Sequence, residues 1–257
     1  MVRENNLKDA VQEQFGRVAA KYLTSAVHAQ GEDLPVMVEA ANLKGDERVL
    51  DAGCGAGHTA ASFAPHVGEV VALDFTATML NQVEVLADDR GLTNLSTRLG
   101  DVEKLPFADS SFDLVVSRYS AHHWARPDKA LREFHRVLRA GGQFLLSDVL
   151  GFGDPVCDTY LNAIEVLRDP SHVRNYTLEE WSNRFAAAGF NLEVVFPYRI
   201  FLQFEEWTER METPEVNRAA IRALYSASPQ EVREALQIDD RGHSFQCAVM
   251  RGTSSRS

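Results

Sequence analysis

The sequence predicts an α/β fold in which a mostly parallel sheet is covered by helices on both faces. From Arg48 to Asp148, short apolar runs alternate with stretches of helical periodicity, which is typical of β-α-β units. Three glycines follow the first apolar run, and an acidic residue stands at the end of three of the runs. Because ligands bind beyond the carboxyl ends of the strands in such sheets, we expect these residues in one site.

Residues 45–150 are predicted to form the core of this fold. Helices at 76–90 and 129–139 carry apolar residues at i, i+3 and i+4 and end before glycines. The five predicted strands are short apolar runs at residues 48–51, 70–74, 95–99, 114–117 and 143–147.

Helical segments are expected before and after this core in the sequence. Residues 1–44 have helical spacing at 7–30 and 36–43, separated by a break at Gly31 and Asp33 to Pro35. Residues 151–188 form a small helical insertion, and insertions at this edge of a sheet commonly shape the substrate pocket. Its helices are predicted at 156–167 and 178–188, the second introduced by a capping-box pair, Thr177 and Glu180.

The C-terminal part, residues 189–257, returns to a strand pattern. Two runs, at 192–204 and 244–250, are predicted to form an antiparallel edge of the sheet, with a mostly helical stretch at 215–236 between them.

The glycine loop after the first strand is the main candidate for ligand binding. Asp51 ends the strand, and Gly53, Gly55 and Gly57 follow before the helix that starts near His58. Glycines let the backbone approach a ligand closely and adopt φ angles that other residues avoid. The N–H groups at the start of the helix point toward the same place.

The acid before the glycines favours a cationic ligand over a diphosphate. A dinucleotide site has the pattern G-x-G-x-x-G, but His58 occupies the position of its third glycine. A carboxylate at Asp51 would repel a diphosphate and attract a positively charged group. S-adenosylmethionine, which carries an ammonium and a sulfonium, is therefore favoured over NAD(P) and over a reductase function.

Two further acids follow later strands at the spacing that a nucleoside requires. Asp74 comes about twenty residues after the first glycine, where an acid can accept both ribose hydroxyls. Met79 opens the next helix and can lie against a purine, while Asp101 can accept from an exocyclic amine. Each acid also has a purely structural interpretation: Asp74 as a helix cap and Asp101 as a turn former.

Composition and charge argue against several classes of protein. The chain has 257 residues, is 45% hydrophobic and carries a formal charge of −11, which argues against a nucleic-acid surface. No run has the length of a membrane span and no signal-peptide core is apparent, so a cytoplasmic location is expected. Cys54, Cys157 and Cys247 lack the spacing of a disulfide framework or a zinc site.

These motifs together resemble class I S-adenosylmethionine-dependent methyltransferases of the UbiE-like group. The series includes D-x-G-x-G-x-G from Asp51 and G-D-x-x-x-L-P-F from Gly100, and covers about residues 45–150. Two further segments, S-R-Y-S-A-H-H-W from Ser117 and R-D-P-S-H-V-R-N-Y from Arg168, resemble the bacterial YafE and YcgJ type. The resemblance implies a Rossmann-like fold with a seven-stranded sheet, and S-adenosylmethionine as the methyl donor.

The resemblance also implies roles for individual residues. The N-terminal helices are expected to act as a lid, so Phe15 and Tyr22 contact ligand unless they belong to the core. The acceptor is expected to be a small molecule with an O, N or C nucleophile, a phenolic or enolic ring being the first guess. The cofactor is expected to contact the glycine loop and a set of residues that follow strands: Asp51, Asp74, Phe75, Met79, Asp101, the backbone of Val102 and the carbonyl of Arg118.

Methyl transfer is an in-line displacement that needs alignment and exclusion of water but no metal. A base is needed when the acceptor is a hydroxyl or a carbon acid, and His122 or His123, after the fourth strand, can provide it. Tyr119 is expected beside the acceptor. The alternatives are that the histidines only pack on the lid, and that the protein binds the cofactor without catalysis.

A second cluster lies in the inserted segment. Arg168, His172 and Arg174 either form a solvated face, which is the common case for charged residues, or roof the pocket and meet an anionic group on the acceptor.

Overall fold

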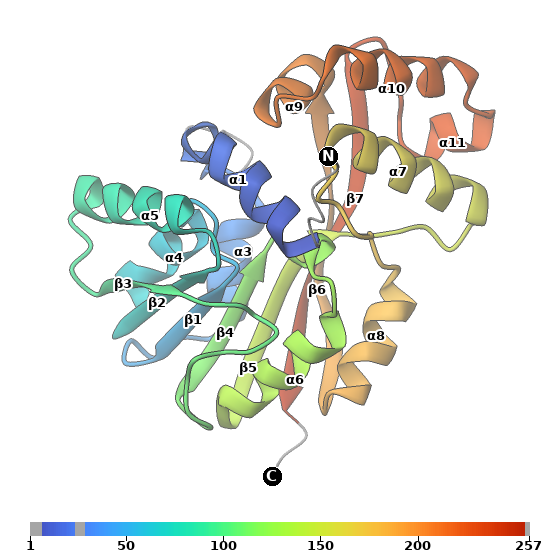
Figure 1. Cartoon of the computed structure of the whole chain (residues 1–257). Coiled ribbons are helices and arrows are strands. Elements are labelled where there is room, and N and C mark those ends of the chain that lie inside the picture. The colour runs from blue at the N-terminus through green and yellow to red at the C-terminus, as the bar shows by residue number, and fades with distance from the viewer. Residues whose placement is uncertain (1–6, 24–28, 255–257) are drawn as a thin grey trace.

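The fold is described by a computed structural model that covers residues 7–23 and 29–254. Within these ranges the chain forms one seven-stranded sheet in the order β3-β2-β1-β4-β5-β7-β6 (Figure 1). β1 to β5 are parallel, whereas β7 is antiparallel to both of its neighbours. The strands are β1 Arg48–Ala52, β2 Glu69–Asp74, β3 Leu95–Leu99, β4 Phe112–Arg118, β5 Leu138–Val149, β6 Phe190–Gln203 and β7 Gly242–Ser254.

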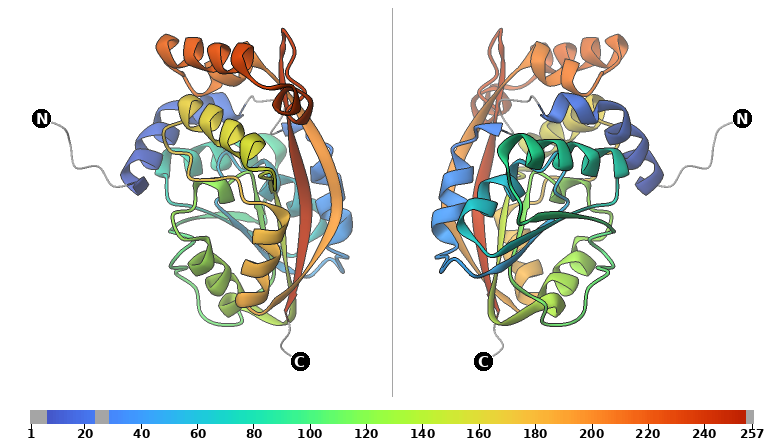
Figure 2. Two further views of the ribbon diagram at one scale, coloured as in Figure 1. Left: turned by 90° about the vertical axis from the view of Figure 1, so that its right-hand side faces the viewer. Right: turned by 90° about the vertical axis from the view of Figure 1, so that its left-hand side faces the viewer.

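Helices cover both faces of the sheet, as predicted. α3, α4 and α5 lie on one face, and α6 and α8 lie on the other (Figures 1 and 2). The helices are α1 Leu7–Leu23, α3 Asp33–Ala40, α4 His58–Phe63, α5 Ala77–Arg90, α6 Pro127–Val137, α7 Pro155–Arg168, α8 Leu178–Ala187, α9 Phe204–Arg210, α10 Glu215–Ala227 and α11 Gln230–Ala235.

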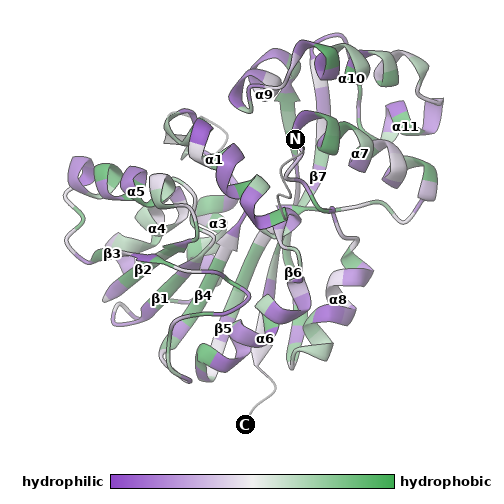
Figure 3. Ribbon diagram, in the orientation of Figure 1, coloured by the Kyte–Doolittle hydropathy of each residue, from purple (hydrophilic) through white to green (hydrophobic). Residues whose placement is uncertain are grey.

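The alternation of side chains along each strand divides the core into two layers. In β1, Val49 packs into the layer under α3, α4 and α5, and its neighbour Leu50 packs into the layer under α6 and α8. Both side chains are fully buried. The central strands β1, β2 and β4 are covered on both faces and are buried along most of their length, whereas the edge strand β3 carries polar residues and is partly exposed (Figure 3).

A second group of helices packs beyond the ends of the two C-terminal strands. α7 contacts both α10 and α11, and α9 follows directly from β6 (Figure 1). This group therefore draws on both of the predicted ranges 151–188 and 189–257. The predicted capping box is confirmed: Thr177 Oγ1 accepts from Glu180 N, and the Glu180 carboxylate accepts from Thr177 N.

Two predicted boundaries differ from the structure. Asp33 to Pro35 were expected to break the chain but form the first turn of α3, where a proline costs no hydrogen bond. The predicted helix at 215–236 divides into α10 and α11, because Pro229 cannot continue α10. α1 covers Leu7–Leu23 of the predicted helix at 7–30, and residues 24–28 of that prediction lie outside the described residues.

The fifth strand is also longer than predicted. β5 begins at Leu138, which pairs with Phe112, and a register shift follows before Gln143 pairs with Leu114. Gly141 has a φ of 76°, which permits the irregular turn of the chain at this shift. The predicted strand at 143–147 is only the regular part of β5.

Candidate functional site

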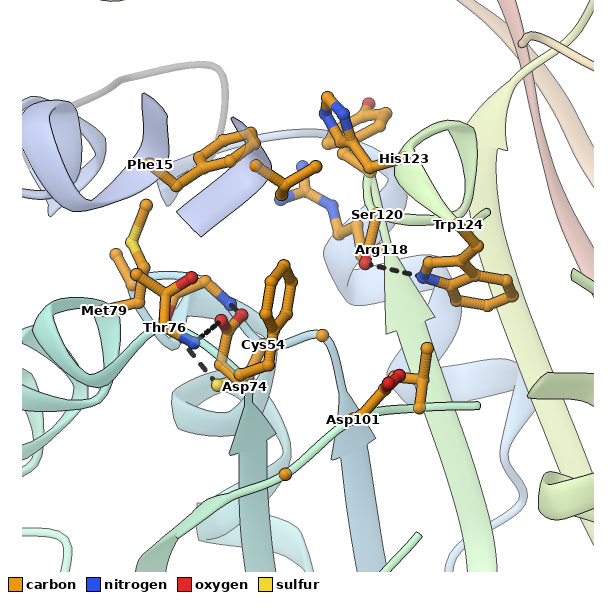
Figure 4. A pocket seen from close by; sticks show the side chains of 18 of the residues that line it. Phe15, Cys54, Asp74, Thr76, Met79, Asp101, Arg118, Ser120, His123 and Trp124 are labelled. Atoms are coloured by element: carbon orange, nitrogen blue, oxygen red, sulfur yellow. Dashed lines mark hydrogen bonds between the residues drawn. The ribbon is translucent and has the colours of Figure 1, made fainter. Parts of the chain in front are cut away.

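A pocket lies beyond the carboxyl ends of β1, β2 and β4, where the strand order reverses around β1. Ligands bind at this switch point in open α/β sheets. Its volume is about 1000 Å³ including the open mouth, and α1 crosses above it (Figures 1 and 4). Its walls come from α1, the glycine loop, the ends of β2 and β4, and two loops: Lys8, Val11, Phe15, Gly53 to Ala56, His58, Thr59, Asp74 to Thr76, Met79, Gly100 to Glu103, Arg118 to Ser120 and His123 to Ala125.

The three glycines of the loop serve different purposes. All have positive φ angles, of 74°, 51° and 88° for Gly53, Gly55 and Gly57. A Cβ on Gly53 would lie 2.2 Å from Ser120 Oγ, and one on Gly57 would lie 3.0 Å from Val83. A Cβ on Gly55 would meet no atom within 4 Å. Gly55 therefore leaves space for a ligand, whereas Gly53 and Gly57 allow close packing.

Asp74 organises this loop from the end of β2. Its carboxylate accepts hydrogen bonds from the backbone N of Gly55 at 3.0 Å and of Thr76 at 2.8 Å. The carboxylate also lines the pocket, so ligand hydroxyls can approach it. Asp74 thus both lines the pocket and shapes the glycine loop, while the N-cap of α5 is Thr76.

Asp51 lies behind the glycine loop and not in the pocket wall, which differs from the predicted direct contact. Its side chain is 1% exposed, and Oδ2 accepts from Ala60 N in α4 at 2.9 Å. Burial raises the pKa of this carboxyl to about 7, with a further contribution from the nearby Asp74. When it is ionised, Asp51 can therefore attract a ligand only electrostatically, without a direct contact.

Asp101 forms a turn, which agrees with its structural interpretation, and it also lines the pocket, while its contact with an exocyclic amine stays a prediction. Its Oδ1 accepts from Glu103 N at 2.9 Å, and its Oδ2 forms an ion pair with Lys8 of α1. Lys8 also pairs with Glu103 at 2.9 Å. These contacts hold the first turn of α1 over the pocket. Phe75, Met79 and Val102, predicted beside the cofactor, line it as well.

Arg118, predicted to contribute only a carbonyl, anchors a buried polar network with its side chain. Its Nε and Nη2 donate to Asp33 Oδ2 and Oδ1 at 2.6 and 2.8 Å. Ser147 Oγ also donates to Asp33 Oδ2, at 2.8 Å. Ser147 lies 2.8 Å from Tyr198 Oη, and Tyr198 lies 2.7 Å from Tyr119 Oη. The network joins α3 to β4, β5 and β6.

The two histidines after β4 occupy different environments. His123 lines the pocket, with its ring edge-on to Phe15 at 4.9 Å between centroids. His123 Nδ1 lies 3.2 Å from Ser171 O, and Nε2 lies 3.9 Å from Asp169 Oδ2. His122 does not line the pocket, and its Nδ1 bonds to Asp148 at 2.6 Å.

These environments move the two pKa values in opposite directions. Burial alone would lower the pKa of His122, but the charge and hydrogen bond of Asp148 outweigh it and raise the value. Burial, and then the charge of His122, lower the pKa of His123 to about 4. His123 is therefore neutral near pH 7, whereas the contact with Asp148 favours the protonated form of His122.

The cluster predicted in the inserted segment does not line the pocket. Arg168 is buried and donates to Trp207 O at 3.2 Å, and His172 is buried beside Asn162, whose Oδ1 lies 3.3 Å from its Nε2. Burial lowers the pKa of His172 to about 2. Arg174 is partly exposed and pairs with Asp158 and Glu180. Tyr22 lies in α1, but its side chain is outside the described residues.

Several residues of the site were not identified from the sequence, because their partners are remote in the chain. Lys8 and Asp101 are 93 residues apart, and Asp33 and Arg118 are 85 apart. The only local signal was an acid beside a proline at the start of α3, which is also common in loops. Ser120 Oγ accepts from Trp124 Nε1 at 3.1 Å, which places this indole in the wall (Figure 4).

The described ranges hold neither a metal-binding cluster nor a membrane-spanning helix. No group of three or more His, Cys, Asp or Glu side chains there is arranged to hold a metal ion. No helix in residues 7–23 and 29–254 has the length and apolarity needed to cross a bilayer. The three cysteines all lie in the described part, and each is a buried free thiol.

Comparisons with known proteins agree with this geometry. Residues 50–146 match the family model of a methyltransferase domain. The chain is 38% identical to the uncharacterized methyltransferase YcgJ of Bacillus subtilis over 87% of this chain and 88% of that protein. It is 43% identical to the uncharacterized protein YafE of Escherichia coli K12 over 70% of this chain and 86% of that one.

Two further similarities concern a functionally named relative and a crystal structure. The ubiquinone/menaquinone biosynthesis C-methyltransferase UbiE of Pseudomonas aeruginosa LESB58 is 34% identical over 60% of this chain and 62% of that protein. The crystal structure of Bacillus subtilis YcgJ superposes with a TM-score of 0.83 at 34% identity, over 87% of this chain and 98% of that one. The chain therefore belongs to the class I S-adenosylmethionine-dependent methyltransferases.

Proposed function

We propose that this pocket holds S-adenosylmethionine and transfers its methyl group to a small molecule. The observation that carries the proposal is the open space above Gly55, beside a carboxylate, Asp74, that holds the glycine loop and lines the same pocket. Asp101 and the apolar side chains of Met79 and Val102 provide a wall for the adenine. When bound, the sulfonium supplies a methyl group with a good leaving group, and the protein supplies alignment and a dry site.

The acceptor is an uncharged molecule with an apolar face. Val11, Phe15 and Trp124 supply apolar wall, which suits a ring. Lys8 and Arg118, the lysine and the arginine of the described wall, are both paired with carboxylates. A phenolic or enolic ring meets these conditions, and the name of the UbiE relative, a C-methyltransferase, supports a carbon nucleophile. An anionic acceptor would find no uncompensated cation here.

His123 is the proposed base for such an acceptor. It lines the pocket and is neutral near pH 7, so it can take a proton from an acidic hydroxyl or carbon acid. The hydrogen bond to Asp148 raises the pKa of His122, which disfavours it as a base, and His122 lies outside the wall. We expect His123→Ala to lower kcat by roughly 100-fold, a typical value for a lost base. His122→Ala should act mainly on stability.

The decisive experiment identifies the acceptor. The protein is incubated with methyl-labelled S-adenosylmethionine and a metabolite extract, and the labelled product is identified by mass spectrometry. We expect a labelled small molecule whose yield, at a subsaturating concentration of S-adenosylmethionine, is lower with Gly55→Ala. Calorimetry with S-adenosylmethionine and with NADH separates the alternatives: heat with NADH alone would indicate a reductase. Cofactor binding without any labelled product would indicate a non-catalytic binding protein.

A further inference from the structure

The segment that carries the motif R-D-P-S-H-V-R-N-Y is bonded to the two histidines, although its charged side chains do not line the pocket. The backbone N atoms of Val173 and Arg174 donate to His122 O at 2.9 and 3.3 Å. Ser171 contacts the next residue, His123, from which it is separated by 48 positions in the chain. Because these bonds hold the segment against a residue of the pocket wall, its polar side chains can act on that residue.

Ser171 determines which ring nitrogen of His123 carries the hydrogen. His123 Nδ1 lies 3.2 Å from Ser171 O and 3.4 Å from Ser171 Oγ. A carbonyl oxygen can only accept, so Nδ1 must be the donor. Ser171 Oγ donates its own hydrogen to Asp169 Oδ1 at 2.6 Å, so it too can only accept from the ring. In the neutral imidazole the lone pair that takes a proton is therefore on Nε2.

Asp169 places a carboxylate oxygen beside this nitrogen. Its Oδ1 accepts from Ser171 N at 2.9 Å and from Ser171 Oγ, which fixes the orientation of the carboxyl group. Its buried Oδ2 has no hydrogen-bond partner among the described residues and lies 3.9 Å from His123 Nε2. This distance is too long for a hydrogen bond, but at a buried site it permits a strong attraction between opposite charges. Asp169 is outside the pocket wall, so it acts on the ring and not on a ligand.

The other titratable groups around His123 do not take this position. The ring centroids of His122 and His172 lie 4.3 and 6.4 Å from that of His123, and Asp148 is bonded to the far histidine, His122. Burial and then the charge of His122 lower the pKa of His123, whereas Asp169 and Asp148 oppose this change. Asp169 is the one of these two acids that forms an ion-pair contact with the ring of His123 itself.

We propose that Asp169 is the positioning residue for His123: with Ser171 it fixes the Nδ1–H tautomer, and its charge stabilises the imidazolium that forms when Nε2 takes a proton. In this step the proton passes from the O–H or C–H bond of the acceptor to Nε2. The electron pair of that bond stays on the acceptor and forms the bond to the methyl group, whose bond to sulfur breaks. This inference rests on the proposed function, in which His123 is the base.

The test is a ¹⁵N NMR measurement on the labelled full chain without any ligand. Long-range ¹H–¹⁵N spectra distinguish protonated from unprotonated ring nitrogens, and the signals that disappear in His123→Gln belong to His123. At pH 7 we expect the hydrogen on Nδ1 and none on Nε2. Asp169→Asn should lower the affinity of Nε2 for a proton at least about 10-fold, because an opposite charge at this distance is lost. The change of the Nε2 chemical shift between pH 7 and pH 4.5 measures this affinity.

Asp128→Asn on α6, which removes the exposed pair with Arg184, is the matched control and should leave the proton affinity of Nε2 unchanged. Ser171→Ala removes one of the two hydrogen bonds to Asp169 Oδ1 and should lower this affinity by a smaller factor. It keeps the inference testable if thermal melts show that Asp169→Asn is unfolded.

Two results would overturn the inference. One is a hydrogen on Nε2 of neutral His123 in the wild-type protein, and the other is a proton affinity that folded Asp169→Asn leaves unchanged. Neither result depends on a cofactor or an acceptor. A failure of S-adenosylmethionine to bind in calorimetry would instead contradict the proposed function.

Discussion

At the scale of single residues, an added Cβ can have two effects that a pair of glycines allows us to distinguish. One is the strain of a left-handed backbone, and the other is the loss of space for a ligand. Gly55 and Gly91 both have left-handed φ angles, of 51° and 63°, and a Cβ on either would meet no atom within 4 Å. Each change to alanine should cost about 1 to 2 kcal/mol of unfolding free energy, the strain of a left-handed residue. Only Gly55→Ala places a methyl group in the pocket.

We therefore expect Gly55→Ala to weaken S-adenosylmethionine binding at least about 10-fold, since a misplaced methyl costs 1 to 3 kcal/mol. Gly91→Ala, at the end of α5 and outside the pocket wall, should bind as the wild type does. Urea unfolding and calorimetry on the two variants give both quantities. An equal loss of affinity in both would mean that strain, and not occupied space, controls binding.

Asp51 should make folding dependent on pH in the absence of ligand. Its pKa is raised from 3.8 to about 7, so between these values the folded state binds a proton more tightly than the unfolded state. Its contribution to stability therefore falls as the pH rises from about 4 to about 7. Asp51→Asn should remove this part of the slope in urea unfolding measured across that range. A slope unchanged by the substitution would contradict the raised pKa.

At the scale of elements, α1 is attached to the cofactor side of the pocket by Lys8. Lys8 and Asp101 are 41% and 36% exposed at their side chains, so the pair contributes less than about 1 kcal/mol to stability. Lys8→Gln should nevertheless raise the dissociation rate of S-adenosylmethionine several-fold, because α1 crosses the pocket. Stopped-flow fluorescence measures this rate.

Lys21→Gln is the control on the same helix. Lys21 pairs with Glu212 at 2.8 Å, is similarly exposed and lies outside the pocket wall. Loss of the Lys21 and Glu212 pair should change the free energy of unfolding by about as much as loss of the Lys8 pair. It should change the dissociation rate of S-adenosylmethionine by less. If both variants release the ligand equally fast, the Lys8 contacts have no special role at the pocket.

At the scale of the whole molecule, the Asp33 and Arg118 pair connects α3 to the sheet. Asp33→Asn leaves a buried guanidinium without its counter-charge, and removing one partner of such a pair typically costs about 3 to 5 kcal/mol. Adding Arg118→Met should recover much of that loss. Urea unfolding at pH 7 measures both variants, since Asp33, with its pKa below 3.8, is ionised there.

A surface pair provides the comparison. Glu193→Gln, which removes the pair with Arg251 at a glutamate 61% exposed, should cost less than about 1 kcal/mol. A loss for Asp33→Asn no larger than this would show that the buried pair does not hold α3 in place. Because Arg118 also lines the pocket, cofactor affinity should fall in parallel with stability.

The amino-acid sequence by itself determined the order of strands and helices and the position of the ligand site. This was possible because those features depend on local properties: apolar runs, caps such as Thr177, and glycines and acids where strands end. Parallel strands bring their carboxyl ends to one edge, so Gly55, Asp74 and Asp101 had to meet.

Only the tertiary structure decided which of these groups face the pocket. The side chain of Asp51 lies behind the loop and bonds to α4, and the side chains of Arg168 and His172 are buried in the interior. The partners Asp33 for Arg118 and Lys8 for Asp101 came from distant parts of the chain. The physical reason is that side-chain burial, and the ion pairs and pKa values that follow from it, depend on packing between elements, which no local pattern specifies.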